Sequence, residues 1–466
     1  MKKKEKEPIF SGADRDRVAA DLRALVDFQE KGIPLKDLSR LITRALVPHL
    51  MRYGSPRFQS FFNAPPERGA EWGARLALHH NQGVTNWQVS PGGAMLEELC
   101  VRSLCRLFGF PEGADATFMY CGTYANQQAL YMALHRHAAR RGFDLAEKGL
   151  AGFHGTPLPA VVASAQAHFS LRHAVRLLGL GEESLVLIPV DRNHRLDMDR
   201  LQATLEELKQ KGRRDVFCLV ATAGTTSTGS VDPIPPAVEV CRRSGIWLHV
   251  DGAYGLAYSL VPEWSRLFTG FTEADSVSWD PHKQLEIPIP NSLLFARRGS
   301  DFERLAIYGE YFNRRDDPNP NPGLKSPPST RPLAALSLVA SIRHQGMDGV
   351  LRRLRAPLLA VRNAAEKLRR ESDVELVNEP ETGVLCLRIV PPGVGEPELS
   401  ALQRRIYEKI QSGRERSISI TELGGKSVLR LVAVSSRVTE ASLLETGAVL
   451  RRWGRTLAGR RGSSRR

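Results

Sequence analysis

Long apolar runs are missing from this sequence of 466 residues, and so are the cysteine and histidine spacings of metal sites. No window approaches the roughly 20 apolar residues that a membrane-spanning helix needs. The charged start MKKKEKEPIF also lacks the apolar stretch of a secretory signal. We therefore expect a cytoplasmic protein with no membrane partner. The six cysteines show no CxxC or Cys/His ligand spacing, so we expect neither disulfides nor a metal site.

The net charge of +14 comes without a helix-turn-helix, RNP or zinc-finger signature. Much of the excess lies in KKKEK at the start and RRWGRTLAGRRGSSRR at the finish. Basic ends of this kind are usually solvated tails. We expect no nucleic-acid partner. An anionic substrate or cofactor is a simpler explanation for the positive charge that remains outside the ends.

Three common motifs of nucleotide and hydrolase chemistry are absent when the letters are compared one by one. The run GLG at 179–181 continues without the third glycine of a dinucleotide fingerprint, and GKS at 425–427 lacks the earlier glycine of a P-loop. The run GTTSTG at 224–229 does not make a GxSxG nucleophile elbow. These absences remove the main support for a dehydrogenase, an NTPase or a serine hydrolase.

Short apolar segments alternate with helical patterns through the middle of the chain. They are bounded by Gly, Asp or Pro and lie at 161–165, 184–190, 216–222, 246–251, 276–279 and 292–296. This alternation predicts a mostly parallel sheet that is covered by helices on both faces. Near the C-terminus, the segments VLCLRIV, SISIT and VLRLVAV predict a separate small α/β domain.

The remaining segments are predicted from spacing and composition. Apolar residues at helical spacing between residues 18 and 26 predict an amphipathic helix. Residues 54–93 are rich in Gly, Pro, Asn and aromatics, which predicts a long loop. Helical patterns are expected at 94–108 and 332–370, with a Pro/Asn/Gly/Ser-rich break at 314–331 before the second.

Residues with useful chemistry follow several predicted strands, at the edge where open α/β sheets bind ligands. Asp251 ends the strand IWLHVD, and a buried carboxylate there needs a cationic partner such as a protonated pyridine nitrogen. Lys283 is either extending its charge to water or used as an amine. His168 follows the strand VVASA, and Cys121-Gly-Thr precedes a helix whose N-terminal amides can hold a phosphate. Together these groups predict a site for pyridoxal 5′-phosphate.

The chain resembles the group II pyridoxal 5′-phosphate-dependent amino acid decarboxylases, whose fold is the aspartate aminotransferase-like fold type I. Matching segments occur in family order over nearly the whole chain, which is stronger evidence than any single match. They are NWQVSPGGAMLEEL (86–99), YCGTYANQQAL (120–130), SAQAHFSLRHAVRLLG (164–179), ATAGTTSTGSVDPI (221–234), HVDGAYG (249–255), SVSWDPHK (276–283) and SITELGGKSVLRLVAV (419–434).

This resemblance implies a carboxy-lyase that converts an L-amino acid to its amine and carbon dioxide through a Schiff base on Lys283. The implied fold is a mostly parallel seven-stranded sheet in a large domain and a small C-terminal α/β domain. The implied limits are 1–90 for an N-terminal helical and loop segment with dimer-swapped contacts, 91–345 for the large cofactor-binding domain, 346–460 for the small domain and 461–466 for a basic tail. A homodimer with shared active sites is also implied.

The resemblance gives catalytic roles to three residues. Lys283 carries the cofactor, Asp251 pairs with the pyridinium nitrogen and keeps the ring an electron sink, and His168 stacks on one face of the ring. Ala253 packs against the other face, where a larger side chain would not fit. The full set of implied cofactor-binding residues is Gly122, Thr123, His168, Thr225, Asp251, Ala253, His282 and Lys283.

Two departures from the family pattern concern the same site. Many family members carry a proton-donating tyrosine on a mobile loop, but no tyrosine occurs between Phe312 and Arg331. Either Tyr308, Tyr311 or His168 with water then supplies the proton to Cα, or the outcome of the reaction differs. The family often has Asn where this chain has Asp280. A carboxylate near the cofactor phosphate is repelled unless it is protonated or turned toward a cation such as Lys283 or an arginine.

Two other functions stay open from the sequence. One is another pyridoxal phosphate-dependent lyase or aldehyde synthase of the same fold, and the other is a non-catalytic binding protein that keeps the fold. The intact set of Lys283, Asp251 and His168 argues against the second. The motifs leave the substrate amino acid open, because specificity is expected from loops near 61–66 and 83–88 and from a partner chain.

Overall fold

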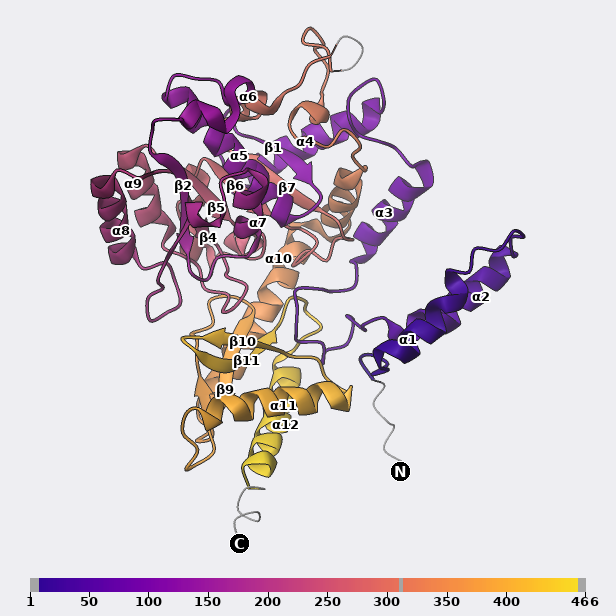
Figure 1. Cartoon of the computed structure of the whole chain (residues 1–466). Helices are drawn as coiled ribbons and strands as arrows, with labels where there is room; N and C mark the ends of the chain where they lie inside the picture. Colours follow the sequence, from indigo (N-terminus) through magenta and orange to yellow (C-terminus); the bar gives the residue numbers. More distant parts are fainter. Residues whose placement is uncertain (1–7, 310–312, 460–466) are drawn as a thin grey trace. The chain divides into compact units, whose positions relative to one another are not determined.

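The computed structural model of the chain describes residues 8–309 and 313–459. Two compact units are present (Figure 1). The larger unit contains Pro65–Leu358 with Glu379–Thr382, and the smaller one contains the described parts of Met1–Ala64, Leu359–Asn378 and Gly383–Arg466. Residues 1–7 and 460–466 of the two basic ends and Tyr311 lie outside the described residues. The first part of the C-terminal run lies in helix α12, Glu440–Gly459, where Arg451 and Arg455 both pair with Asp373.

The larger unit is built on a seven-stranded sheet with the order β1-β7-β6-β5-β4-β2-β3. Five neighbouring strands are parallel to one another, namely β3, β2, β4, β5 and β6. Strand β7 runs antiparallel to β6, and β1 runs antiparallel to β7. The mostly parallel seven-stranded sheet is therefore confirmed. The strands are β1 Asp115–Met119, β2 Leu158–Ser164, β3 Leu185–Ile188, β4 Arg214–Thr222, β5 Trp247–Asp251, β6 Ser276–Trp279 and β7 Ser292–Ala296.

Helices pack along this sheet. Helix α5 packs against strands β4 to β7, while α8 contacts β3 and β4 and α9 contacts β4 and β5. The helices of this unit are α3 Arg68–His80, α4 Pro91–Phe108, α5 Gly122–Arg140, α6 Leu145–Lys148, α7 Ser170–Leu177, α8 Met198–Lys211, α9 Ile234–Ser244 and most of α10 Ala334–Leu368. Helix α10 is interrupted at Gly346, which has a φ of 63°. The helices expected at 94–108 and 332–370 are confirmed.

Helix α5 owes its position to small residues at helical spacing. Ala125, Ala129 and Ala133 recur every four residues, so they share one face of the helix, and each is at most 1% exposed. They belong to the core cluster that also contains Val220 and Trp247 from the sheet. The short side chains let the helix backbone approach the strands closely. This packing fixes the first turn of α5 beside the carboxyl ends of the strands.

The expectation of a long loop over residues 54–93 is wrong in its middle part, where α3 forms. The two glycines of α3 do not mark loops but close packing against α10. A β-carbon at Gly69 would lie 2.6 Å from His344 Cβ, and one at Gly73 would lie 2.9 Å from Ala340 Cβ. The glycine content that favoured a loop reflects a helix–helix contact that only the fold reveals.

The smaller unit has an antiparallel four-stranded sheet with the order β10-β11-β9-β8, which confirms the expected C-terminal α/β unit. Its apolar core is formed by the sheet and by helices such as α11 and α12. The elements are α1 Arg15–Leu22, α2 Leu35–Ala45, β8 Val374–Leu376, β9 Val384–Ile389, α11 Glu398–Gly413, β10 Ser419–Leu423, β11 Lys426–Val432 and α12 Glu440–Gly459. Helix α1 covers only the first part of the helix expected at 18–26, and none of its residues is buried.

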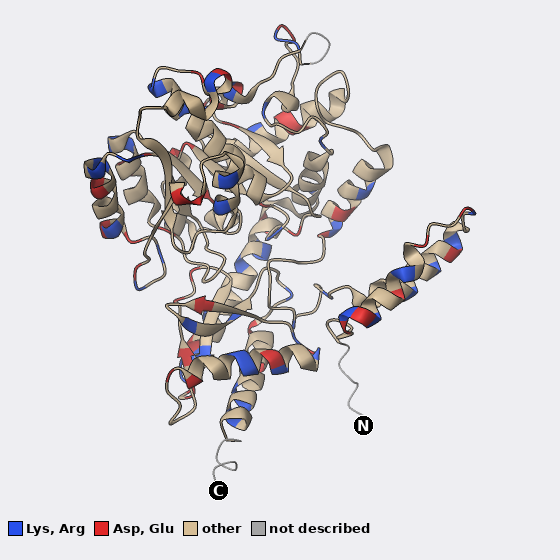
Figure 2. Cartoon of the chain, in the orientation of Figure 1, with Lys and Arg blue, Asp and Glu red and all other residues tan. Residues whose placement is uncertain are grey.

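Among the described residues, no helix combines the length and apolar character needed to cross a membrane. Basic and acidic residues both occur along helices such as α11 (Figure 2). This mixing of signs is what a solvated helix face shows.

Candidate active site

The carboxyl ends of the parallel strands bring the predicted residues together. Asp251 is the last residue of β5, Lys283 lies four residues after the end of β6, and His168 lies four residues after the end of β2. Gly122 opens α5 at the same edge of the sheet. These residues surround a cavity of about 180 Å³ that is lined by Cys121, Gly122, Thr123, Asn126, His168, Thr222, Gly224, Thr226, Asp251, Ala253, Tyr254, Asp280 and Lys283.

Asp251 is held as a buried anion by three donors. Asn126 Nδ2 donates to its Oδ2 at 2.7 Å, while the amide of Ala253 and the hydroxyl of Ser278 donate to Oδ1 at 3.1 and 3.2 Å. Burial by itself raises the pKa of this carboxyl. The positive charge of Lys283 and the Asn126 hydrogen bond act against that effect, and the pKa lies below its ordinary value.

Behind Asp251 a chain of hydrogen bonds fixes the orientation of Asn126. The carbonyl oxygen of Asn126 lies 3.0 Å from His249 Nε2, and His249 Nδ1 lies 2.9 Å from the Ser276 hydroxyl. Trp247 Nε1 donates to the same hydroxyl at 2.8 Å. Burial lowers the pKa of His249 to about 4, so a neutral imidazole supports the Asn126 amide.

This supporting network was not predicted as part of the site. Asn126 and His249 both lie inside segments that match the family, YCGTYANQQAL and HVDGAYG, but neither residue was given a role. A usable signal was the spacing of four between Gly122 and Asn126, because a helix places such residues on one face. Tyr254 and Thr222 also line the cavity and were not predicted.

His168 is positioned by its own turn. Its Nδ1 accepts a hydrogen bond from the Ser170 amide at 3.2 Å, which leaves the proton on Nε2. Burial lowers the pKa of His168, and the nearby Asp251 opposes this effect only in part. His168 is therefore a neutral ring at neutral pH, suited to stacking on an apolar surface.

Lys283 and Asp280 form an ion pair, with Nζ of the lysine 3.0 Å from Oδ2 of the carboxylate. The turn that follows β6 holds them together, because the Lys283 amide donates to the Asp280 carbonyl at 3.0 Å. The sequence left two arrangements open for Asp280, protonation or orientation toward a cation. The carboxylate is turned toward Lys283.

Two other predicted residues are not among those that line the cavity. The hydroxyl of Thr225 is buried and lies 2.8 Å from the Thr228 hydroxyl within the turn after β4. His282 Nδ1 lies 2.6 Å from the Asn291 carbonyl oxygen, and burial lowers its pKa. Their assignment as cofactor-binding residues stays a prediction, as do the roles of the six that line the cavity. Those six are Gly122, Thr123, His168, Asp251, Ala253 and Lys283.

Tyr308 is not among the cavity residues either. It is 37% exposed, and the Arg315 guanidinium lies 4.2 Å from the centre of its ring. Within residues 8–309 and 313–459, no cluster of three or more His, Cys, Asp or Glu side chains has a geometry that could hold a metal ion.

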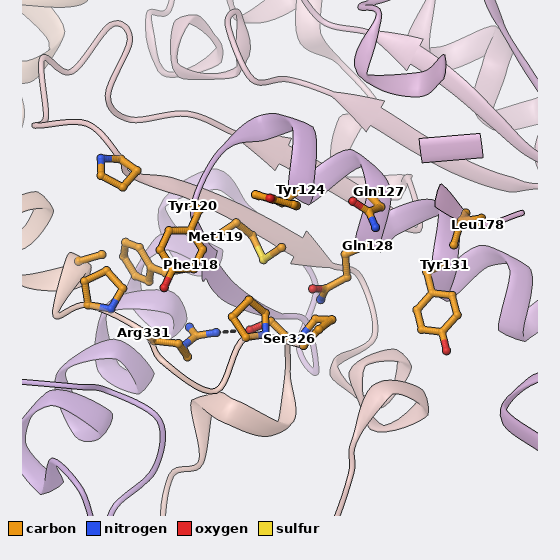
Figure 3. Close-up of a pocket in the computed structure, with 15 residues that line it drawn as sticks. Phe118, Met119, Tyr120, Tyr124, Gln127, Gln128, Tyr131, Leu178, Ser326 and Arg331 are labelled. Carbon is orange, nitrogen blue, oxygen red and sulfur yellow. Dashed lines mark hydrogen bonds between the residues drawn. The ribbon is translucent and has the colours of Figure 1, made fainter. Parts of the chain in front are cut away.

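A second and larger cavity, of about 300 Å³, lies along another face of α5 (Figure 3). Tyr120, Tyr124 and Gln128 line it from the start of α5 and the residues before it. At its base Arg331 donates to the Ser326 hydroxyl. Its lining is mostly apolar and includes prolines at 290, 327, 328 and 332. This cavity shares no lining residue with the smaller one.

The residues of the smaller cavity fit pyridoxal 5′-phosphate. A lysine amine, a buried carboxylate and the first turn of a long helix are the groups that its aldehyde, pyridine nitrogen and phosphate need. Space for the ligand depends on small residues, because a β-carbon at Gly122 would lie 3.1 Å from Ala253 Cβ and 2.9 Å from Asp280 Oδ2. The Thr222 hydroxyl is buried there with no hydrogen-bond partner in the part of the chain that the structure describes. Fold and site together define a fold type I pyridoxal phosphate protein.

Comparisons with known proteins agree with this class. The sequence model of the pyridoxal-dependent decarboxylase conserved domain matches residues 21–390. L-2,4-Diaminobutyrate decarboxylase of Rhizobium meliloti (strain 1021) is 29% identical over 90% of this chain and 82% of its own length. Aromatic-L-amino-acid decarboxylase of Bacillus atrophaeus is 25% identical over 94% of this chain and 89% of its own length.

The solved structure of mouse CSAD in apo form shares the fold, with a TM-score of 0.87, 24% identity and coverage of 96% of this chain and 94% of that chain. The family match extends over most of the sequence. The chain belongs to the pyridoxal-dependent decarboxylase family, and its activity is that of a pyridoxal phosphate-dependent amino acid decarboxylase.

Proposed function

We propose that this protein removes the α-carboxyl group of an L-amino acid, giving the amine and carbon dioxide, with Lys283, Asp251 and His168 as its catalytic residues. The observation that supports these roles is that all three residues line the same cavity, in which Asp251 is held as a buried anion. When bound, pyridoxal phosphate supplies a conjugated ring that accepts the electrons of the broken bond to the carboxyl group.

Asp251 keeps the pyridine nitrogen protonated in this proposal. Its charge is stabilised by three hydrogen-bond donors that are already in place, so little reorganisation is needed when charge develops. A buried, preorganised carboxylate stabilises a neighbouring positive charge far more strongly than a carboxylate in water does. Asn126 acts through Asp251 and is a positioning residue.

His168 and Ala253 hold the two faces of the ring. The neutral imidazole of His168 can stack without repelling a pyridinium, and Ala253 leaves room on the other face. Lys283 binds the cofactor's aldehyde carbon through its amine. Gly122 and Thr123 present the first turn of α5 to the phosphate, and we place Thr225 and His282 close to the cofactor in the same role of holding it.

The proton that Cα needs after carbon dioxide leaves has several possible donors in this chain. His168 lines the cavity and carries a proton on Nε2. Tyr308 reaches the site only if the segment that carries it moves, and Tyr311 is the other tyrosine of that segment. Water bound by His168 is the third source.

The substrate is an L-amino acid, and the choice of side chain falls to residues outside the cofactor cavity. The two relatives reported above act on 2,4-diaminobutyrate and on aromatic amino acids, so relatives of similar identity differ in substrate. We propose that residues 83–88 and residues of a second chain select the side chain. Residues 91–345 form the functional cofactor-binding domain and 346–460 the small domain in this account.

A cytoplasmic homodimer with shared sites completes the proposal. Apolar side chains line the larger cavity, and Tyr124 among them is more than half exposed. Ile289, next in sequence to the lining residue Pro290, is also more than half exposed. A second chain would cover such a surface. Residues 1–90 would then provide contacts across the subunit interface.

Borohydride reduction followed by peptide mapping tests the assignment of Lys283. Reduction fixes pyridoxal phosphate on the lysine that carries it, and we expect the label on the peptide that contains Lys283. The Lys283→Ala variant should take up no label there. A label on another lysine in the parental protein would end the assignment.

A further inference from the structure

Asp280 contributes a second carboxylate to the cofactor cavity. Its side chain is only 4% exposed. One oxygen pairs with Lys283, while the other is buried without a hydrogen-bond partner among the described residues. Asp251 differs, because both of its oxygens accept hydrogen bonds. A buried oxygen without a donor is costly, so an attraction elsewhere must hold Asp280 in place.

The N-terminus of α5 supplies part of that attraction. A β-carbon at Gly122 would lie 2.9 and 3.1 Å from the two carboxylate oxygens of Asp280. Gly122 is the first of 19 residues in this helix, and its N-cap residue Cys121 makes no side-chain capping bond. Helix N-termini attract anions through their amides and their dipole. The Asp280 carboxylate therefore lies against the end of the helix that is suited to a phosphate.

A phosphate at this helix end and the Asp280 carboxylate carry charges of the same sign. Like charges in a cavity with little water repel strongly. Lys283 sharpens the conflict, because the amine that balances Asp280 is the amine that the cofactor requires. An amide at position 280 would remove the negative charge and keep the size of the side chain.

We propose that Asp280 is an internal competitor of the cofactor's phosphate. In the cofactor-free protein its carboxylate holds the Lys283 ammonium and the N-terminus of α5, and this lowers the affinity for a phosphate-bearing ligand. The inference rests on the proposed function, from which it takes the position of the phosphate. It makes residue 280 the determinant of how readily the protein gains and loses its cofactor.

Titration calorimetry of inorganic phosphate into the cofactor-free protein is the direct test. We expect Asp280→Asn and Asp280→Ser to bind phosphate about tenfold more tightly than the parental protein, because both remove the competing charge. Affinity for pyridoxal 5′-phosphate should rise in parallel. Affinity for pyridoxal, which has no phosphate, should rise less than affinity for pyridoxal 5′-phosphate, because only the release of Lys283 acts on it. Thermal unfolding of each variant checks that the fold is retained.

Asp316→Asn is the matched control. Its side chain is 70% exposed and outside the cavity, so this variant changes the net charge by the same amount and should bind phosphate as the parental protein does. Equal or weaker phosphate binding by both Asp280 variants would overturn the inference while leaving the proposed function intact. Failure of the parental protein to bind either pyridoxal or pyridoxal 5′-phosphate would overturn the proposed function, and the inference with it.

Discussion

At the scale of single residues, Asp251 has the most completely defined surroundings in the site. Its two oxygens accept three hydrogen bonds, and the donor Asn126 is itself fixed by His249. Such a residue does not reorient when its environment changes. The function of Asp251 in our account is purely electrostatic. Replacing it with asparagine removes the charge and changes the shape of the side chain little.

The Asp251→Asn variant tests that function. We expect pyridoxal phosphate still to bind, because Lys283 and the first turn of α5 are unchanged. Turnover should fall about 100-fold or more, as when a preorganised electrostatic group is lost. Steady-state kinetics and the absorbance of the bound cofactor measure the two effects separately.

The control is Ser278→Ala, which removes one donor to Asp251 and keeps the charge. It should reduce turnover much less than Asp251→Asn does. Parental turnover by a fully loaded Asp251→Asn protein would refute the electrostatic role.

The sequence predicted individual residues best where a strand end fixed their position. Asp251 ends one apolar segment that was predicted as a strand and Lys283 follows another, so their meeting at one edge of the sheet followed from the fold class. Asn126 was missed because its role depends on a hydrogen bond to a residue 125 positions away. Local pattern carries no information on such a contact.

At the scale of secondary-structure elements, strand β5 joins the site to the core. His249 lies two residues before Asp251 and is fully buried. Its pKa of about 4 lies below the ordinary value of 6.5. Between these two pH values the unfolded chain binds a proton that the folded chain does not.

We therefore expect the free energy of unfolding to decrease as pH falls from 6.5 toward 4. His249 should account for about 3 kcal/mol of this decrease. Urea unfolding of the parental protein and of His249→Gln across this pH range measures the contribution. The variant should be less stable at pH 7 but should lose less stability on acidification. The same loss in both proteins would contradict the assignment.

Helix α3 gives a second prediction at this scale. Gly73→Ala would place a methyl group 2.9 Å from Ala340 Cβ and Ser337 Cα of α10. We expect this overpacking to destabilise the protein by about 1–3 kcal/mol, although alanine favours helix formation more than glycine does. Thermal or urea unfolding measures the effect.

Gly92→Ala is the control, because Gly92 lies in α4 and, apart from its own stretch of helix backbone, no atom of the described residues lies within 4 Å of the position of the added carbon. It should leave stability unchanged or raise it. Equal effects of the two substitutions would show that α3 and α10 tolerate separation.

Elements were predictable from sequence when their pattern was long or strongly apolar. Strand β1 was missed because its five residues, DATFM, contain no β-branched apolar residue and lead directly into α5. Helix α3 was missed because its glycines resemble those of a loop. In both cases tertiary packing, rather than local preference, decides the structure.

At the scale of the whole molecule, the main proposal to test is that two chains form a homodimer. Light scattering after size-exclusion chromatography should give twice the chain mass of 51.6 kDa. Replacing the exposed Tyr124 and Ile289 by charged residues should shift the protein toward the monomer and reduce activity, because shared sites would be separated. A fully active monomer would exclude shared sites.

The central claim is that this chain releases the α-carboxyl group of an amino acid as carbon dioxide. The most direct measurement presents carboxyl-labelled L-amino acids, one at a time, to the loaded protein and analyses both the gas and the organic product. Our account predicts labelled carbon dioxide and an equal amount of the corresponding amine from at least one amino acid, with neither product from Lys283→Ala. An aldehyde in place of the amine, or no release from any amino acid by a fully loaded protein, would contradict it.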